Sequence, residues 1–300
     1  MVQPLPFRAM RIALVTCTEM PRPDWDLPIL ETAFAARGAA ARTVAWDDAT
    51  VDWSTYDVAL IRSTWNYVAH FRAFRSWLDH VSASTRLINP LPAILWNLHK
   101  RYLAELAASG IPVVPTVVVP HGTEPSWGEL FERFGDVVVK PAVSAGSFAT
   151  IRVARGDAAA AHAHRAAHPD RDMLVQPLLA SVVAHGESNL VHFGGRFSHA
   201  IHKGARWAGQ DEQSRGLAEP APDELALAQR VLQAAAAHNH GPLAYARVDM
   251  ARGADGEPLL MELEIVEPSL YLDRAPDRAA ALVDVVMRQG GEASPATPSE

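Results

Sequence analysis

Charged residues at alternate positions near the end of the chain carry the clearest chemical signal in the sequence. One short segment places Arg247 two residues before Asp249, and a second places Glu262 two residues before Glu264. Successive side chains of a strand point to opposite faces, so each pair shares one face if its segment is extended. We predict that the two segments form a hairpin with Asp249 opposite Glu262, which gathers the four side chains within about 5–8 Å.

A cluster of carboxylates on one sheet face is unfavourable unless a cation compensates its charge. The oxygens of Asp249, Glu262 and Glu264 suit Mg²⁺, with Mn²⁺ as a substitute, and these ions also bridge nucleotide phosphates. A solvent-exposed face whose acids need no ion is the alternative. The apolar residues between the acids and the neighbouring Arg247 favour the metal site.

Lysines that could contact phosphate are few in this chain. Lys140 ends an apolar run and is followed by small residues, which leave room for backbone N–H groups to wrap a phosphate chain. Lys100 lies near an expected helix start, and Lys203 ends an expected strand. Neither a Walker A loop nor a Gly-x-Gly-x-x-Gly fingerprint is present. Each lysine taken singly is typical of a solvated surface charge, so the signal depends on their combination.

The composition of the chain limits the classes of partner. Lysine and arginine number 27 against 34 aspartates and glutamates, a net charge of −7, so a general basic surface for nucleic acid is not expected. Cys17 is the one cysteine, which excludes an intrachain disulfide and favours the cytoplasm. No apolar stretch approaches the roughly 20 residues of a membrane span.

Strand-like and helix-like segments alternate in the first third of the chain, which predicts an α/β layer domain over residues 1–95. The segments expected there are Ile12–Cys17, Asp26–Arg37, Ala41–Trp46, Val58–Ile61 and His70–Val81. A second, α+β block over 96–180 contains an expected edge strand, Met173–Pro177, that turns into a linker. A third block, 181–290, contains two expected hairpins, and the tail 291–300 is expected to be flexible.

The order of these residues resembles that of the ATP-grasp superfamily, including its glutathione synthetase-like members. In that superfamily a lysine precedes the central subdomain, and a strand-end lysine with a small-residue loop follows. A hinge strand that holds adenine comes next, then an acidic residue that often contacts the ribose, and last an Asp…Glu-x-Asn/Glu set for Mg²⁺. The resemblance covers about residues 96–270 and depends on order and spacing together.

The resemblance implies an ATP-grasp fold, in which an N-terminal α/β layer domain is followed by two α+β subdomains that enclose ATP. It implies ATP and a pair of Mg²⁺ ions as cofactors, with Asp249, Glu262 and Glu264 as the metal ligands. The implied ATP-binding residues are Lys100, Lys140, Ser144, Ala145, Gly146, Ser147, Gln176, Pro177, Leu178, Leu179 and Glu187. Many relatives have Asn where Glu264 stands, so this metal site would carry additional negative charge.

A narrower resemblance is to the cyclo-ligases that close O-ureido-D-serine to D-cycloserine. The stretches that carry it are Leu60–Tyr67, Asn97–Tyr102 and Glu264–Ser269. It implies a ring-closing ligase of antibiotic biosynthesis, which phosphorylates the substrate carboxylate to an acyl phosphate and releases ADP, phosphate, CO2 and ammonia. Arg247 and Lys203 are then the expected catalytic residues. The expected substrate-binding residues are Arg62, Ser63, Thr64, Glu267 and Ser269.

Two other functions stay open from the sequence. An intermolecular carboxylate–amine ligase for amino acids or peptides would share every nucleotide-binding residue and differ only in the substrate pocket. A non-catalytic nucleotide sensor would tolerate loss of the metal carboxylates or the phosphate lysines, and this chain keeps both sets. The expected partners are ATP and a small amino-acid-like substrate, and a homodimer is left open. For Arg62, Ser63 and Thr64, ordinary capping at a strand end is the alternative to substrate binding.

Overall fold

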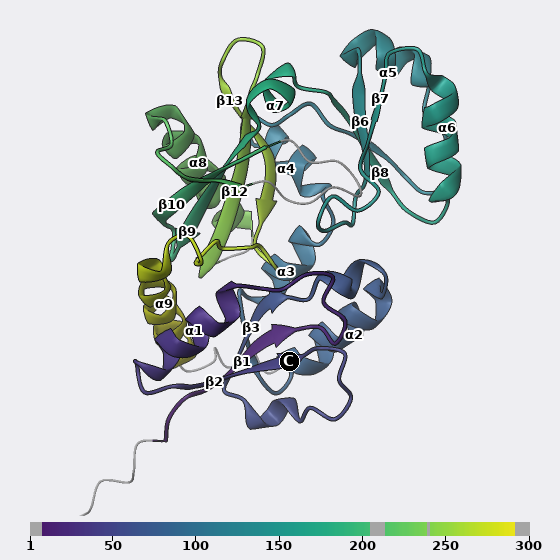
Figure 1. Ribbon diagram of the computed structural model, residues 1–300. Helices are drawn as coiled ribbons and strands as arrows, with labels where there is room; N and C mark the ends of the chain where they lie inside the picture. The colour runs from purple at the N-terminus through teal and green to yellow at the C-terminus, as the bar shows by residue number, and fades with distance from the viewer. Residues whose placement is uncertain (1–7, 205–213, 239–240, 292–300) are drawn as a thin grey trace, which may run out of the picture. The chain divides into compact units, whose positions relative to one another are not determined.

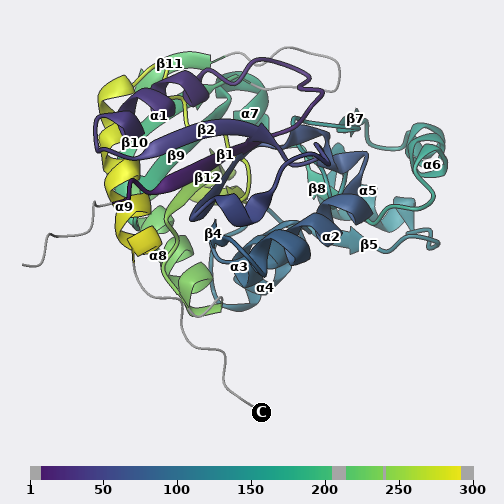
Figure 2. The same cartoon turned by 90° about the horizontal axis from the view of Figure 1, so that it is seen from below.

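The end of the chain returns to the unit in which the chain begins. The parts of the chain that the computed structural model describes are residues 8–204, 214–238 and 241–291 (Figure 1). Contacts divide the chain into an N-terminal unit, 1–91 with 266–300, and a second unit, 92–265. The sequence predicts that the last segment stays with the C-terminal subdomain, whereas helix α9 (Ala279–Gly291) packs against helix α1 (Asp26–Ala35) in the N-terminal unit (Figure 2). Most of the predicted flexible tail lies outside the described residues.

A four-stranded parallel sheet forms the middle of the N-terminal unit, with the strand order β2-β1-β3-β4. Its strands are β1 (Arg11–Thr16), β2 (Ala40–Ala45), β3 (Val58–Ser63) and β4 (Arg86–Ile88). The two central strands are almost completely buried, as in other parallel sheets whose faces are covered by helices. Helix α2 (Phe71–Ser82) buries Phe74, Leu78 and Val81 on one stripe, as their spacing predicts. The short helical turns of this unit are η1 (Trp53–Thr55), η2 (Trp65–Val68) and η3 (Pro276–Arg278).

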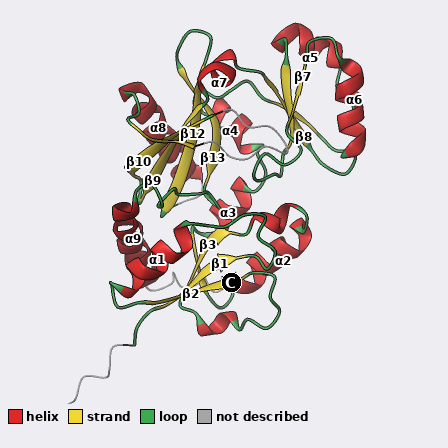
Figure 3. Cartoon of the chain, viewed as in Figure 1, coloured by secondary structure: helices red, strands yellow, loops and turns green. Residues whose placement is uncertain are grey.

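The second unit contains two antiparallel sheets (Figure 3), of which the first has the strand order β5-β8-β6-β7. Its strands are β5 (Val117–Val119), β6 (Val137–Pro141), β7 (Ile151–Val153) and β8 (Met173–Pro177). The prediction of an edge strand at Met173–Pro177 is wrong, because the short β5 pairs with its outer side. Helices α5 (Trp127–Phe134) and α6 (Ala158–Ala167) pack apolar side chains against this sheet.

The second sheet of this unit has five strands in the order β11-β10-β9-β12-β13. They are β9 (Glu187–Phe193), β10 (Arg196–Lys203), β11 (Ser214–Ala218), β12 (Tyr245–Arg252) and β13 (Pro258–Glu264). Helix α8 (Pro222–His238) covers one face through an apolar cluster. The other helices of this unit are α3 (Leu91–Asn97), α4 (Tyr102–Ala108) and α7 (Ala180–His185). No helix in the described ranges is both long and apolar enough to cross a membrane.

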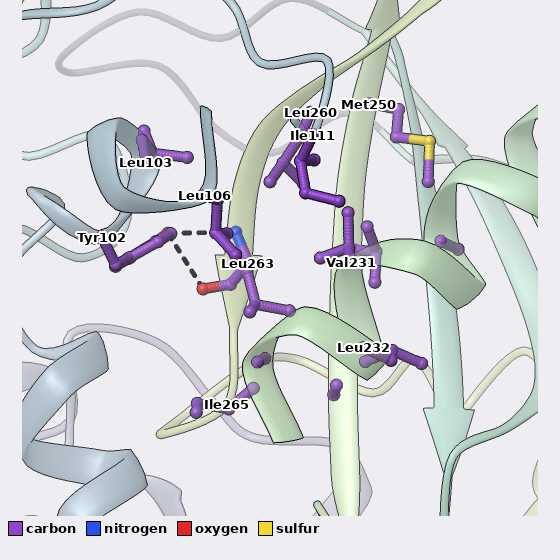
Figure 4. Close-up of a cluster of buried hydrophobic side chains, with 14 of the residues drawn as sticks. Tyr102, Leu103, Leu106, Ile111, Val231, Leu232, Met250, Leu260, Leu263 and Ile265 are labelled. Atoms are coloured by element: carbon purple, nitrogen blue, oxygen red, sulfur yellow. Dashed lines mark hydrogen bonds between the residues drawn. The ribbon is translucent and has the colours of Figure 1, made fainter. Parts of the chain in front are cut away.

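Two side chains near helices α3 and α4 hold strand β13 in place. The Tyr102 hydroxyl donates to the Leu263 carbonyl and accepts from the Leu263 N–H, both at 3.0 Å, as the dashed lines in Figure 4 show. The Asn97 amide donates to the same carbonyl at 2.8 Å and accepts from the Ile265 N–H at 3.3 Å. Lys100 lies between these two clamp residues in the sequence, so the clamp places this lysine beside β13.

Candidate active site

The predicted acidic hairpin is confirmed. Strands β12 and β13 pair in antiparallel register, with Asp249 opposite Glu262 and Arg247 opposite Glu264. The register shifts directly after Asp249, between that residue and Met250. Bulges of this kind often lie next to active sites, where they change the direction in which a side chain points.

Strand β9 extends the row of polar residues beyond the hairpin. Asn189 pairs with Asp249 on one side of β9, and Glu187 pairs with Lys203 of β10 on the other. We call this surface of the sheet, together with the lysines that reach it from neighbouring elements, the charged face. Residues at intervening positions, such as Leu190 and Val248, belong to the apolar cluster on the opposite side. The alternation of strand side chains therefore separates a charged face from a packed core.

A buried arginine joins two acids of the charged face. The Arg247 guanidinium donates from Nε and Nη2 to both carboxylate oxygens of Asp249, at 2.8 and 2.7 Å. The same Nη2 lies 2.5 Å from Glu264 Oε1. Burial alone would raise the pKa of Asp249, but the Arg247 guanidinium, Lys203 and Asn189 together outweigh burial and lower that pKa. Asp249 is therefore an ionised, fixed carboxylate, and its fork-like pairing is the geometry in which arginine binds anions most strongly.

All three lysines of the chain lie at the charged face. Lys100 Nζ lies 3.0 Å from Glu262 Oε1, and Lys140 Nζ lies 4.0 Å from Glu262 Oε2. Lys203 Nζ lies 2.5 Å from Glu187 Oε1. Burial lowers the pKa of Lys140, although Glu262 opposes this effect. Burial raises the pKa of Glu262, but Lys100 and Lys140 oppose this effect, and the net result is a lowered pKa.

Among the described residues of the charged face, the basic and acidic side chains are equal in number. Its basic side chains are Lys100, Lys140, Lys203 and Arg247, and its acidic side chains are Glu187, Asp249, Glu262 and Glu264. Because these formal charges cancel, the face offers no net positive charge to a ligand with several negative charges. A nucleotide would therefore have to bring its own cations.

The small-residue loop after β6 is tied to Lys100. Lys100 Nζ donates to the Ser144 carbonyl at 2.6 Å and to the Ser144 hydroxyl at 3.1 Å. After Ala145 the chain turns, with φ of +60° at Gly146 and +61° at Ser147. Glycine adopts this left-handed region readily, whereas serine does so only where its surroundings impose it. The structure thus brings one loop residue into direct contact with a lysine of the charged face.

The segment Gln176–Leu179 connects the two sheets of the second unit, as expected of a hinge. The buried Gln176 amide donates to Thr116 Oγ1 at 2.8 Å, and Pro177 ends strand β8. The Leu178 N–H donates to the Asp136 carbonyl at 2.9 Å, and Leu179 directly precedes α7. Their role in binding adenine stays a prediction.

The predicted substrate residues belong to the N-terminal unit, and one of them has a clear structural role there. Arg62 is completely buried and donates to Asp26 Oδ2 at 3.1 Å and to the Pro268 carbonyl at 2.7 Å. Asp26 also accepts from the N–H groups of Leu270 and Leu272, each at 2.7 Å. Arg62 and Asp26 thus brace the segment after Pro268, a contact that strand-end position alone does not predict.

Of the other predicted substrate residues, Ser63, Glu267 and Ser269 form hydrogen bonds, whereas the buried Thr64 hydroxyl has no partner among the described residues. The Ser63 hydroxyl, beside Thr64 at the end of β3, donates to Thr16 Oγ1 at 2.9 Å. The Glu267 carbonyl accepts from the Trp65 indole at 3.1 Å. Ser269 accepts from Arg22, whose guanidinium lies 4.1 Å from the centre of the Trp65 ring. Substrate binding by these residues stays a prediction.

Sequence reasoning missed two residues near these groups. Asn189 is completely buried and pairs with Asp249 across strands β9 and β12. Because it lies two residues after Glu187 on one strand, the alternation of side chains could have placed it on the same face. Arg22 lies in an irregular segment before α1, where no periodicity indicates the direction of a side chain. Only the folded chain places it beside Trp65 and Ser269.

The donor set of the charged face suits a divalent cation that arrives with phosphate. Carboxylate oxygens are the ligands that Mg²⁺ prefers, and Asp249, Glu262 and Glu264 supply them. Within the described ranges, no three acidic, histidine or cysteine side chains converge closely enough to enclose an ion. Mg²⁺ in nucleotide sites is usually held by one or two carboxylates plus substrate phosphates, so these residues fit it without such an enclosure.

Two solved structures identify the fold of the chain. The chain is similar to a D-alanine–D-alanine ligase from Bacillus anthracis complexed with ATP, with a TM-score of 0.65 and 16% identity, over 94% of this chain and 97% of that one. It is similar to the ATP-grasp ligase PsnB complexed with a minimal precursor, Mg and ADP, with a TM-score of 0.62 and 14% identity, over 96% of this chain and all of that one. The predicted ATP-grasp fold, a parallel N-terminal sheet followed by two antiparallel sheets, is confirmed.

Closer relatives define the family. Residues 12–89 match the family model described as the N-terminal domain of D-cycloserine synthetase DcsG. The cycloserine biosynthesis protein DcsG of Streptomyces lavendulae is 37% identical in an alignment 286 residues long, which covers 89% of this chain and 95% of that protein. The crystal structure of D-cycloserine synthetase DcsG matches with a TM-score of 0.86 and 36% identity, over 93% of this chain and 99% of that one. The chain belongs to the DcsG family of D-cycloserine synthetases.

Proposed function

We propose that this chain is an ATP-dependent cyclo-ligase that converts O-ureido-D-serine into D-cycloserine, a step of antibiotic biosynthesis. The observation that supports the proposal most is the identity of 37% to a cycloserine biosynthesis protein along nearly the whole chain. The charged face adds the chemistry that the proposal needs, because it combines lysines, an arginine and carboxylates. The cytoplasm is the proposed location, as the single cysteine favours, and a homodimer stays a prediction.

The nucleotide site of the proposal consists of the residues that the sequence singles out. Lys100 and Lys140 hold the phosphates together with the loop Ser144–Ser147, Gln176–Leu179 holds the adenine, and Glu187 contacts the ribose. The contact between Lys100 and Ser144 supports this arrangement, because it places one lysine and the loop at the same point. Asp249, Glu262 and Glu264 are the proposed ligands of Mg²⁺, which when bound neutralises charge on the phosphates.

Nucleotide binding would exchange the partners of Glu262. In the described structure this carboxylate is engaged by Lys100 and faces Lys140. Phosphate oxygens are stronger anionic partners for both lysines, so their arrival would release Glu262 to ligate a cation. The site would thus pass from internal ion pairs to contacts with the nucleotide, and neither its lysines nor its acids would be left unpaired.

The proposed reaction transfers the γ-phosphoryl group and then closes a ring. A carboxylate oxygen of O-ureido-D-serine bonds to the γ-phosphorus as the bond to ADP breaks, which gives an acyl phosphate. Arg247 and Lys203 stabilise charge on the transferring group. The ureido nitrogen bonded to oxygen then attacks the carbonyl carbon, loses its proton, and phosphate leaves with the former carboxylate oxygen. Water cleaves the carbamoyl group, which departs as CO2 and ammonia.

Ring closure benefits from the attacking nitrogen being in the same molecule as the acyl phosphate. Well-oriented intramolecular reactions reach effective concentrations of about 10⁵ M or more. The chain therefore needs to fold the substrate and exclude water rather than bind a second amine. This requirement separates the proposal from an intermolecular carboxylate–amine ligase, which would use the same charged face.

ADP release with Mg·ATP and O-ureido-D-serine, together with mass spectrometry of the product, tests the proposal. Wild-type protein is expected to release ADP and form D-cycloserine in equal amounts, and Glu262→Gln is expected to form neither at more than about 1% of that rate. Turnover only with another amino acid and an added amine would replace the cyclo-ligase by an intermolecular ligase. Nucleotide binding without ADP release for any substrate would indicate a sensor.

A further inference from the structure

Asp172, a carboxylate outside the charged face, contacts the residues on either side of Lys100. Asp172, directly before β8, lies with Oδ2 3.1 Å from His99 Nε2. Its Oδ1 accepts from the His121 backbone N–H and lies 2.9 Å from His121 Nδ1. Arg101 Nη2 is 3.8 Å from Oδ2. The pKa of Asp172 is lowered to about 2, because these donors outweigh the effect of burial, so the group is a permanent anion near neutral pH.

The hydrogen bonds around His99 determine which of its ring nitrogens carries the proton. The Arg101 N–H donates to His99 Nδ1 at 3.1 Å, so Nδ1 is the acceptor. Nε2 therefore carries the hydrogen and donates it to Asp172. Burial and then Arg101 lower the pKa of His99 despite Asp172, which keeps the ring neutral and preserves this arrangement.

Main-chain hydrogen bonds connect the same aspartate to Lys100 by a second route. The Lys100 N–H donates to the Ala142 carbonyl, and the Ala142 N–H donates to the Asp172 carbonyl, both at 2.8 Å. The side chain of Asp172 thus holds the residue before Lys100, while its main chain holds the residue that binds the Lys100 backbone. Ala142 also begins the turn that leads to Ser144, the loop contact of the lysine.

We propose that Asp172 is a positioning residue for ATP affinity, which acts by fixing the backbone from which Lys100 reaches the phosphates. The proposal deepens the nucleotide site and rests on the proposed role of Lys100 there. The Asp172 carboxylate contacts His99 and Arg101, which flank Lys100, and His121, which lies in the loop between β5 and α5. Without this carboxylate the neutral His99 loses its hydrogen-bond acceptor. The backbone position of Lys100, the next residue, is then less well fixed.

The test is the affinity for Mg·ATP, measured by titration calorimetry without an amino-acid substrate. Asp172→Asn is expected to weaken binding about tenfold, as loss of a charge-assisted hydrogen bond predicts. Asp57→Asn is the matched control, because Asp57 also accepts from one backbone N–H and one side chain, those of Arg11 and Arg8, and lies in the N-terminal unit. The control is expected to bind within about twofold of wild type. Unchanged binding by Asp172→Asn would overturn the proposal.

A double-mutant cycle distinguishes positioning from general stabilisation. In the background of Lys100→Met, adding Asp172→Asn is expected to cause no further loss of ATP affinity, because the residue that Asp172 positions is already removed. An equal tenfold loss in both backgrounds would overturn the role through Lys100. The KM for the amino-acid substrate is expected to stay within about twofold in Asp172→Asn.

Changes at His99 keep the proposal testable if Asp172→Asn folds poorly. His99→Gln, whose amide can still donate to Asp172, is expected to retain more ATP affinity than His99→Leu, which cannot donate. Equal affinity of the two variants would contradict the proposal. Because nucleotide binding is measured alone, failure of turnover with O-ureido-D-serine would leave this result interpretable.

Discussion

Arg247 pairs with two carboxylates of the β12–β13 hairpin. It forms a two-point contact with Asp249 and a third contact with Glu264, and it is almost completely buried. A buried charge without its partner is strongly destabilising, so removal of the guanidinium would damage the fold as well as the chemistry. A variant that keeps the charge but loses the fork separates these effects.

Arg247→Lys is such a variant. The ammonium group retains one positive charge, but it cannot bind two oxygens in one plane. We expect kcat to fall about 100-fold while the affinity for Mg·ATP changes less than about threefold. ADP release at saturating ATP and calorimetric titration measure the two quantities. A kcat close to wild type would remove Arg247 from the catalytic residues.

Glu264 departs from the Asn of many ATP-grasp relatives, and a substitution tests how much its charge matters. Asn still offers an oxygen ligand but loses the ion pair with Arg247, which measures 2.5 Å. We expect Glu264→Asn to retain turnover within about tenfold of wild type and to need more Mg²⁺ for half-maximal rate. ADP release as a function of Mg²⁺ concentration measures both effects. A loss as complete as that expected for Glu262→Gln would show that the carboxylate itself is required.

At the scale of elements, the alternation of polar and apolar residues predicted strand pairing better than uninterrupted apolar runs did. The hairpin of β12 and β13 was predictable with its register, because charged and apolar residues alternate on both sides of a turn signal. Strand β11 and helix α3 were not predicted, and β8 was taken for an edge strand. The neighbours of a strand depend on segments distant in sequence, which short-range patterns do not report.

Strand β9 carries a buried histidine that gives the fold a pH dependence. Burial is the main cause that lowers the pKa of His192 to about 4. The unfolded chain therefore binds more protons than the native state below about pH 6.5, and stability falls as the pH falls towards 4. We expect wild type to lose about 2 kcal/mol more than His192→Gln between about pH 7 and about pH 5. Urea unfolding at both pH values measures this difference, and parallel losses would contradict it.

At the scale of the whole molecule, the chain is acidic, but its few lysines lie together. The chain has a net charge of −7, yet its three lysines gather at one sheet face. The order of these lysines and of the late acids, through its resemblance to the ATP-grasp pattern, predicted the fold, whereas nucleotide binding at the charged face stays a prediction. The structural role of Arg62 was not predictable, because its partners Asp26 and Pro268 come from opposite ends of the chain.

The central claim is that this ligase activates the carboxylate of O-ureido-D-serine as an acyl phosphate before it closes the ring. The most direct measurement uses substrate labelled with ¹⁸O in the carboxylate and mass spectrometry of the phosphate and the ring product. We predict that D-cycloserine forms and that each released phosphate carries one ¹⁸O atom from the substrate. Unlabelled phosphate formed together with D-cycloserine, or phosphate release without the ring product, would contradict the account.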